Sequence, residues 1–328
     1  MPKKNKPIRA KLIVNPGAGD VSEESARIEQ VTRYLMADGL KVDVALAKPK
    51  KESIPIARKA VKDGYDVVIA MGGDGTIGAV IRGIAGSKVK LGIIAAGTEN
   101  DIARSLGIPE DLKKACALIA SGHTRKLDLG QISTKKRKKF YFFMLTAIGL
   151  PATLYPIISQ VPHGNLSGIK EAVSTFLKFE SKPTVFLTLD DESKIEIETM
   201  LVTIANTPIT GAKNLVAPDA SMEDGLLDIA VYPGFSKAKL LSYFAKTVNE
   251  GSTPDGRIQR YRARKIKVKT SPKLDVSAEG ILVGKGTARI KVLPGALRVI
   301  APEPGRGAEK SRKKATKKLP EPVSPVTQ

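Results

Sequence analysis

The sequence contains few of the residues that build several common kinds of site. It has no tryptophan, one cysteine, two histidines and only 5% aromatic residues. A single cysteine excludes an internal disulfide framework, and so few cysteines and histidines argue against a structural zinc site. No apolar run is long enough to span a bilayer, and the basic start of the chain is not followed by the apolar segment of a secretory signal. We therefore expect a protein of the reducing cytoplasm.

Acidic residues are scarce relative to basic ones. The 328 residues include 54 Lys and Arg against 33 Asp and Glu, a formal net charge of +21. This excess predicts an anionic partner, which could be nucleic acid, an anionic membrane surface or a charged nucleotide. The aromatic residues are not spaced like a base-stacking platform, which disfavours nucleic acid. The basic run Lys135–Lys139 fits either a solvated hairpin tip or a contact with anionic lipid.

The first part of the chain, from Ile8 to Gly130, alternates apolar strands with amphipathic helices. This alternation predicts a mostly parallel sheet covered by helices, in a domain spanning residues 7–130. Cys116 lies in an apolar helical run and is expected in the core. The expected strands are 11–14, 42–47, 67–71 and 89–95, and the expected helices are 23–36, 53–62, 76–84, 100–106 and 112–120.

After Gly130 the pattern changes to short strands rich in β-branched residues, with helices expected near 169–178 and 236–248. This pattern predicts a mainly antiparallel β-sandwich domain over residues 131–296. Residues 297–303 are expected to return to the first domain as a strand, and residues 304–328 to form a disordered basic tail. The expected strands are 140–145, 184–189, 195–199, 201–205, 227–232, 266–269, 281–283 and 288–292.

Three of the expected parallel strands end in polar turns that contain glycine, at residues 15–19, 72–76 and 97–101. The carboxyl ends of such strands form the edge where open α/β sheets bind ligands. Glycines let the backbone approach phosphate oxygens, and a following helix offers free N–H groups. Any one of these turns could be an ordinary turn or helix cap, but three at one edge predict a nucleotide site. A carboxylate within such a turn, such as that of Asp74, would repel phosphate unless a Mg²⁺ ion or a network of bound water lies between them.

Two other glycine-rich segments match phosphate-binding motifs less well. Gly73–Gly78 fits the dinucleotide fingerprint G-x-G-x-x-G, but it follows the third expected strand instead of the first. Gly280–Thr287 resembles a P-loop with one residue too few between its glycines, and it lies among strands. Neither segment predicts a site by itself.

The ordered set of motifs resembles the soluble diacylglycerol kinase family, bacterial lipid kinases that are related to sphingosine and ceramide kinases. The Gly-Gly-Asp-Gly-Thr motif alone is shared with NAD kinases and phosphofructokinases, whereas the full set is specific to the lipid kinases. The matching segments are Asn15-Pro16 with Gly17 and Gly19, Gly72–Thr76, Gly97–Asp101 followed by Ala103-Arg104, Leu127–Gly130, Ala217–Ala220 followed by Asp224–Asp228, and Leu293–Val299.

The resemblance implies transfer of phosphate from ATP to a lipid hydroxyl, in a cleft between an α/β domain and a β-sandwich. It also implies peripheral association with an anionic membrane surface. The implied catalytic residues are Asp74 and Glu279, and the implied metal ligands are Asp74, Asp101 and Asp224. The residues expected to bind nucleotide are Asn15, Pro16, Gly17, Gly72, Gly73, Gly75, Thr76, Gly97, Thr98, Asn100 and Asp101.

Two segments depart from the family pattern. Gly78-Ala79 stands where the family usually has Asn-Glu, and Glu279-Gly280-Ile281 stands where it usually has Asp-Gly-Glu. Glu279 then takes the place of the aspartate that is the proposed base. Two alternative functions stay open: a NAD kinase-like enzyme, and a degenerate kinase that binds nucleotide or anionic lipid without turnover. A homodimer is also left open.

Overall fold

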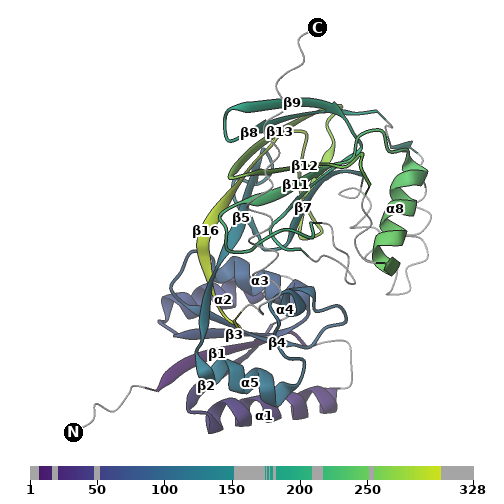
Figure 1. Ribbon diagram of the computed structural model, residues 1–328. Helices are drawn as coiled ribbons and strands as arrows, with labels where there is room; N and C mark the ends of the chain where they lie inside the picture. The colour runs from purple at the N-terminus through teal and green to yellow at the C-terminus, as the bar shows by residue number, and fades with distance from the viewer. Residues whose placement is uncertain are drawn as a thin grey trace.

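The computed structural model describes residues 7–16, 21–47, 52–150, 174, 176, 178–179, 182–208, 217–250 and 255–303. They form two domains stacked end to end (Figure 1). The first comprises β1 (Ile8–Val14), α1 (Val21–Ala37), β2 (Leu40–Leu46), α2 (Ser53–Lys62), β3 (Val67–Gly72), α3 (Asp74–Ile84), β4 (Lys90–Ala95), α4 (Asp101–Ser105) and α5 (Leu112–Ser121).

The four strands of the first domain are parallel and lie in the order β2-β1-β3-β4. Helices α1 and α5 cover one face of this sheet, and α2, α3 and α4 lie on the other (Figure 1). All six residues of β3 are buried, because a central parallel strand is covered on both faces. The expected strands and helices of this domain are confirmed, with bounds that differ by a few residues.

Each face of the sheet has its own apolar core. On the α2–α3 side, Ile77 and Ile81 pack with Ala57. On the other side, Leu35 packs with the buried Cys116. Burial raises the pKa of the Cys116 thiol to about 11, so this cysteine is an unreactive core residue, as the sequence predicts.

The second domain is a sandwich of two antiparallel layers. Its strands are β5 (Thr124–Thr134), β6 (Phe140–Phe142), β7 (Leu145–Gly149), β8 (Thr184–Leu189), β9 (Ser193–Glu198), β10 (Leu201–Ala205), β11 (Leu227–Val231), β12 (Gln259–Ala263), β13 (Lys265–Ser271), β14 (Asp275–Ala278), β15 (Ile281–Lys285) and β16 (Ala288–Ile300); its helix α8 spans Lys237–Glu250. One sheet has the order β12-β11-β10-β7-β14-β15, and its buried face packs with β5, β6, β8, β13 and β16 around a shared core.

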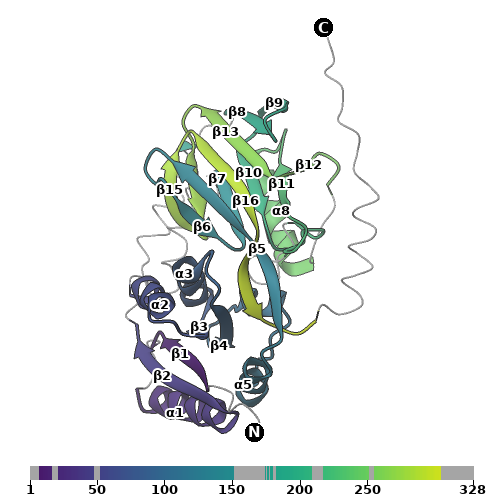
Figure 2. The same cartoon turned by 90° about the vertical axis from the view of Figure 1, so that its left-hand side faces the viewer.

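Strands β5 and β16 belong to both domains. The upper part of β16 pairs with β13, and its lower part, at Arg298 and Val299, pairs in parallel with β4. β5 runs antiparallel along β16, and the two strands bridge the domains side by side (Figures 1 and 2). Their register shifts between Leu293 and Leu297. Residues 130 and 296, where we expect the second domain to begin and end, lie within β5 and β16.

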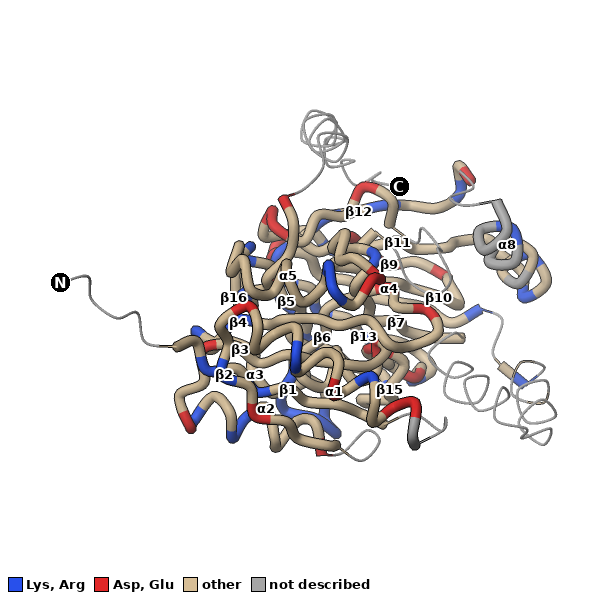
Figure 3. Tube along the Cα trace, turned by 90° about the horizontal axis from the view of Figure 1, so that it is seen from below, with Lys and Arg blue, Asp and Glu red and all other residues tan. Residues whose placement is uncertain are grey.

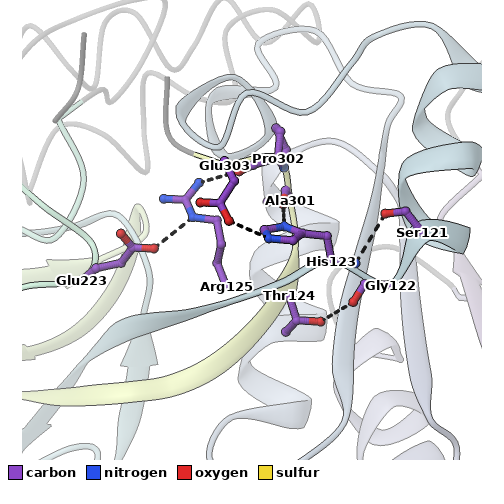
Figure 4. Close-up of polar contacts among 9 residues, drawn as sticks. All are labelled: Ser121, Gly122, His123, Thr124, Arg125, Glu223, Ala301, Pro302 and Glu303. Atoms are coloured by element: carbon purple, nitrogen blue, oxygen red, sulfur yellow. Dashed lines mark hydrogen bonds and ion pairs between the residues drawn. The ribbon is translucent and has the colours of Figure 1, made fainter. Parts of the chain in front are cut away.

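The chain that leaves β16 is held against the start of β5 by a cluster of polar contacts (Figure 4). The His123 ring contacts the carbonyl oxygen of Ala301 and a carboxylate oxygen of Glu303, both at 2.8 Å. Arg125 donates to Glu223 at 2.9 Å and to the carbonyl of Pro302 at 3.3 Å. The Ala301 and Glu303 hydrogen bonds raise the pKa of His123, since a doubly protonated ring can donate to both.

The basic run Lys135–Lys139 connects the antiparallel strands β5 and β6, so the predicted hairpin is confirmed. All five of its residues are exposed. Basic and acidic positions are interspersed in the view from below (Figure 3). In the part of the chain that the structure describes, no helix is long and apolar enough to cross a membrane.

Several features of the second domain differ from the expectations. The expected strand 140–145 is two strands, β6 and β7, and strands β5, β12 and β14 were not predicted. The expected helix at 236–248 is confirmed as α8. Most of the helix expected at 169–178 and all of the tail at 304–328 lie outside the described residues.

Candidate active site

The three polar turns lie side by side at the carboxyl edge of the parallel sheet. They follow β1, β3 and β4, which are neighbours in the sheet. The amide of Asn15 donates to the carbonyl of Met71 at 3.3 Å, and the amide of Ala96 donates to the carbonyl of Gly72 at 3.1 Å. These contacts continue the strand pairing into the turns and fix their relative positions. Gly17 lies outside the described residues, so its predicted role stays a prediction.

The turns after β3 and β4 touch backbone to backbone at Gly73 and Gly97. A Cβ atom on Gly97 would lie 2.4 Å from the Cα of Gly73, closer than carbon atoms approach in proteins. Asn100, in the left-handed region at φ 54°, holds the second turn through two hydrogen bonds of 2.9 Å to the amide and carbonyl of Gly97. Glycine at residue 97 is therefore a packing requirement.

The side chain of Asp74 joins the two turns. Its carboxylate accepts the backbone N–H of Ile102 at 2.8 Å and that of Asp101 at 3.0 Å. These are the first N–H groups of α4, which otherwise has no side-chain cap. Asp74 thus stabilises α4 from the start of α3, and places its charge beside Asp101. The buried carboxylate of Asp101 forms an ion pair with Arg104 at 3.1 Å.

The start of α3 is open toward the same edge. Its cap residue, Gly73, makes no side-chain hydrogen bond, and a Cβ atom on the exposed Gly75 would meet nothing within 4 Å. The hydroxyl of Thr76 accepts from the side-chain amide of Asn15 at 3.0 Å. Free N–H groups beside open space are what an anion needs at a helix N-terminus. This arrangement suits a phosphate group.

Glu279 reaches the same helix from the second domain. It lies in the turn between β14 and β15 at φ 52°, and its carboxylate accepts the N–H groups of Phe143 at 2.9 Å and Met144 at 2.7 Å. A Cβ atom on Gly78 would lie 3.6 Å from a Glu279 carboxylate oxygen. Gly78 is one helical turn after Asp74 on the same face of α3. The structure therefore brings Glu279 to the helix that carries Asp74.

The environment of Glu279 controls its charge. Burial raises the pKa of Glu279, while the amides of Met144 and Phe143 and the nearby charge of Arg82 favour the ionised form. Arg82 is not identifiable from the sequence, because nothing in its spacing marks it as part of a site. It lies one turn after Gly78, at the far end of the same helix face.

Asp224 lies apart from the turns that carry Asp74 and Asp101. It accepts the N–H of Leu226 at 3.0 Å and forms an ion pair with Arg262, which also pairs with Asp228 at 3.1 Å. In the described ranges no three Asp, Glu, His or Cys side chains converge as a metal site, so Asp74, Asp101 and Asp224 do not form one cluster. The ligand role of Asp224 stays a prediction, separate from the sheet edge.

Asp128, which lies in the motif Leu127–Gly130, has a clear structural function. It is buried in β5 and accepts the N–H of Gly225 at 2.7 Å and that of Gly295 at 2.8 Å. It therefore ties the loop before β11 to the irregular part of β16. Burial raises its pKa, with the two hydrogen bonds acting in the opposite direction.

The residues at the sheet edge fit a magnesium nucleotide. Mg²⁺ is usually bound by one or two carboxylates, with substrate phosphates and waters completing its octahedron. The carboxylate of Asp74 lies 3.0 Å from the backbone nitrogen of Asp101, and no described group hydrogen-bonds to the buried side-chain oxygen of Asn15. A buried acceptor of this kind suits a ligand hydroxyl or a bound water.

Comparison with known proteins identifies the same two units. Residues 9–132 match the diacylglycerol kinase catalytic domain, and residues 158–301 match the YegS C-terminal NAD kinase beta sandwich-like domain. A diacylglycerol kinase from Mycobacterium tuberculosis (strain CDC 1551 / Oshkosh) is 31% identical over 249 residues, which cover 75% of this chain and 80% of that protein.

Solved structures share the fold. The crystal structure of a diacylglycerol kinase from Bacillus anthracis strain Sterne matches with a TM-score of 0.68 at 22% identity, covering 91% of this chain and 98% of that one. An NAD kinase from Archaeoglobus fulgidus, crystallised with ATP, matches with a TM-score of 0.53 at 15% identity, covering 94% and 97%. Both matches show the fold alone. The two domain matches and the sequence identity to the mycobacterial enzyme show that the chain belongs to the diacylglycerol kinase family.

Proposed function

We propose that this protein is an ATP- and Mg²⁺-dependent lipid kinase that phosphorylates the hydroxyl of diacylglycerol or a related lipid alcohol. The observation that carries the proposal is that Glu279 faces α3 at Gly78, one turn from Asp74 and the glycine turns. A candidate base from one domain thus lies close to a candidate phosphate site on the other. The family of the chain supports a kinase, and the printed name of its mycobacterial relative supports diacylglycerol as acceptor.

Each residue has a role in this proposal. The glycine turns, Thr76 and the open start of α3 bind the phosphates, and Asn15, Pro16, Gly17, Thr98 and Asn100 complete the nucleotide site. Asp74 and Asp101 hold Mg²⁺, which when bound neutralises charge on the phosphates. Glu279 accepts the proton of the lipid hydroxyl as its oxygen bonds to the γ-phosphorus. The bond from that phosphorus to the bridging oxygen breaks, and ADP leaves with that electron pair.

The pH dependence of this step has a definite direction. Burial raises the pKa of Glu279, and only the ionised carboxylate accepts a proton. Activity is therefore expected to rise with pH as Glu279 loses its proton, and to be low below that range. General-base catalysis is worth roughly 10²–10⁴-fold, so Glu279→Gln is expected to lower kcat by about that factor.

The test is phosphate transfer from labelled ATP to a panel of lipid alcohols in mixed micelles. Glu279→Gln is the matched control, because it replaces the carboxylate with a neutral amide of nearly the same shape; ATP binding is measured in parallel. Absence of transfer to every lipid, with ATP binding intact, would exclude the catalytic role and leave a nucleotide-binding module. Vesicle co-sedimentation with and without anionic lipid tests the proposed peripheral association with a cytoplasmic membrane surface.

A NAD kinase-like activity is the alternative. The Archaeoglobus fulgidus structure supports it only at the level of the fold. The two functions differ in their acceptor, which is a soluble dinucleotide in one and a lipid in the other. Formation of NADP from NAD and ATP, at a rate above that of any lipid, would favour this alternative.

A further inference from the structure

Arg82 and Glu279 approach each other across the position where α3 has glycine. A Cβ atom on Gly78 would lie 3.3 Å from a terminal nitrogen of Arg82 and 3.6 Å from an oxygen of Glu279. Both charged groups therefore flank the space that a side chain at residue 78 would fill. Residues 78 and 82 are one turn apart on the same helix face, so the guanidinium and the carboxylate lie on either side of residue 78, farther apart than a direct ion pair.

The described residues around Arg82 offer it few hydrogen-bond partners. None of them accepts from its buried Nε atom, and its guanidinium carbon lies 5.2 Å from the centre of the Phe140 ring. Arg137, from the hairpin, lies 5.5 Å from that same ring centre, and its charge disfavours a second cation there. Burial lowers the pKa of Arg82, and among the described residues Glu279 is the one anion that opposes this effect. The carboxylate therefore favours the charged form of the guanidinium.

The groups that face the Glu279 carboxylate come from two elements. The turn between β6 and β7 presents the N–H groups of Phe143 and Met144, and α3 presents Arg82. Among the main influences on the pKa of this carboxylate from the described residues, Arg82 is the charged side chain. The backbone donors orient Glu279, and Arg82 supplies the positive potential that opposes the cost of burying its charge.

We propose that Arg82 is a positioning residue that favours the ionised form of Glu279, and that glycine at residue 78 leaves the space through which the two charges interact. This inference rests on the proposed function for its catalytic meaning, because an ionised Glu279 is the form that accepts a proton. It also gives a physical reason for the departure from the family pattern at Gly78, where an asparagine side chain would separate the pair.

The first experiment compares Arg82→Gln with Arg82→Lys in the lipid kinase assay across pH. An opposite charge nearby lowers a carboxyl pKa by about 1–3 units, so its removal in Arg82→Gln is expected to shift the acidic limb of the kcat profile upward. At a pH on that limb, kcat of Arg82→Gln is expected to be about ten-fold or more below that of the wild type. At high pH the two kcat values are expected to converge. Arg82→Lys keeps the charge and is expected to restore most of the profile, with the KM for ATP unchanged in both. An unmoved profile in Arg82→Gln, or equal profiles in the two variants, would overturn the inference.

The second experiment needs no kinase activity and so separates this inference from the proposed function. A double-mutant cycle of Arg82→Gln and Glu279→Gln is measured by urea unfolding at pH 8 and pH 4. When two residues interact, the effect of the double substitution on the folding equilibrium constant typically differs from the product of the two single effects by about two-fold to more than a hundred-fold. We expect such coupling at pH 8 and its loss at pH 4, where the carboxylate is protonated. Zero coupling at pH 8, or equal coupling at both pH values, would overturn the charge interaction. Strong coupling at pH 8 in a protein without lipid kinase activity would overturn the proposed function alone.

Discussion

The contact between Gly73 and Gly97 makes a sharp prediction for the substitution Gly97→Ala. The added Cβ would lie 2.4 Å from the Cα of Gly73, whereas ordinary contacts begin at 3.4 Å. The two turns must therefore separate by about 1 Å, and overpacking of this kind typically costs about 1–3 kcal/mol of folding free energy. A displacement of about 1 Å at a reacting site can also cost roughly 10²-fold in rate.

Gly75→Ala is the matched control, because it adds the same methyl group two residues after Gly73. Its Cβ would meet nothing within 4 Å, and alanine favours a helix over glycine by about 0.5–1 kcal/mol. We therefore expect Gly75→Ala to be as stable as the wild type or more so. It is nevertheless expected to weaken ATP binding, because its methyl group occupies the open space that we assign to phosphate.

Two measurements separate these effects. Thermal unfolding is expected to show a lower Tm for Gly97→Ala, by about 2–4 °C for each kcal/mol lost, and no decrease for Gly75→Ala. Isothermal titration with ATP and Mg²⁺ is expected to show weaker binding in both variants. A Gly97→Ala protein with the Tm of the wild type would refute the packing argument. Full ATP affinity in Gly75→Ala would refute the placement of phosphate at the start of α3.

Three further predictions concern polar groups. Asp74→Ala removes the acceptor for the first N–H groups of α4, so it is expected to lower the unfolding free energy, measured in urea, by about 0.5–2 kcal/mol. The same substitution is expected to abolish phosphate transfer. Asp74→Asn keeps one acceptor and is expected to lose less stability. The pKa of His123 is higher in the folded protein than the usual histidine value of 6.5, so the protonated ring stabilises the fold fully below pH 6.5 and this stabilisation is lost as pH rises through the folded-state pKa. The urea midpoint of the wild type is therefore expected to fall over that pH range relative to the midpoint of His123→Gln. Parallel curves of midpoint against pH for the two proteins would contradict this. Glu223→Ala leaves the buried Arg125 without its carboxylate and is expected to lower the unfolding free energy by about 1–3 kcal/mol, while an unchanged midpoint would show that the pair is dispensable.

The parallel half of the fold could be predicted because its strands are continuous apolar runs that end in glycine turns. β3 is the clearest case, since all six of its residues are buried and the turn with Asp74 follows at once. β5 was missed because it crosses from one core to the other. Its residues face different environments along its length, and Asp128 interrupts its apolar pattern.

The part of the candidate site whose residues directly follow the parallel strands in the sequence could be predicted. Asp74, Asp101 and the glycines follow strands, so strand order alone brings them together. Glu279 was suggested by family resemblance, but its approach to Gly78 depends on how the domains pack. Arg82 could not be found, because a cation in a helix carries no spacing signal and its partner is almost two hundred residues away.

The position of β16 has a consequence for how the protein is made. β16 is the last of the described strands in the sequence, yet it lies inside the ten-stranded sheet, between β4 and β13. During synthesis from the N-terminus, β4 keeps an unpaired edge until residues near Ile300 have left the ribosome. Exposed edges of this kind promote aggregation, and pairing between distant segments is slow. We expect fragments truncated before β16 to be insoluble, and the two domains to reach their native state only together.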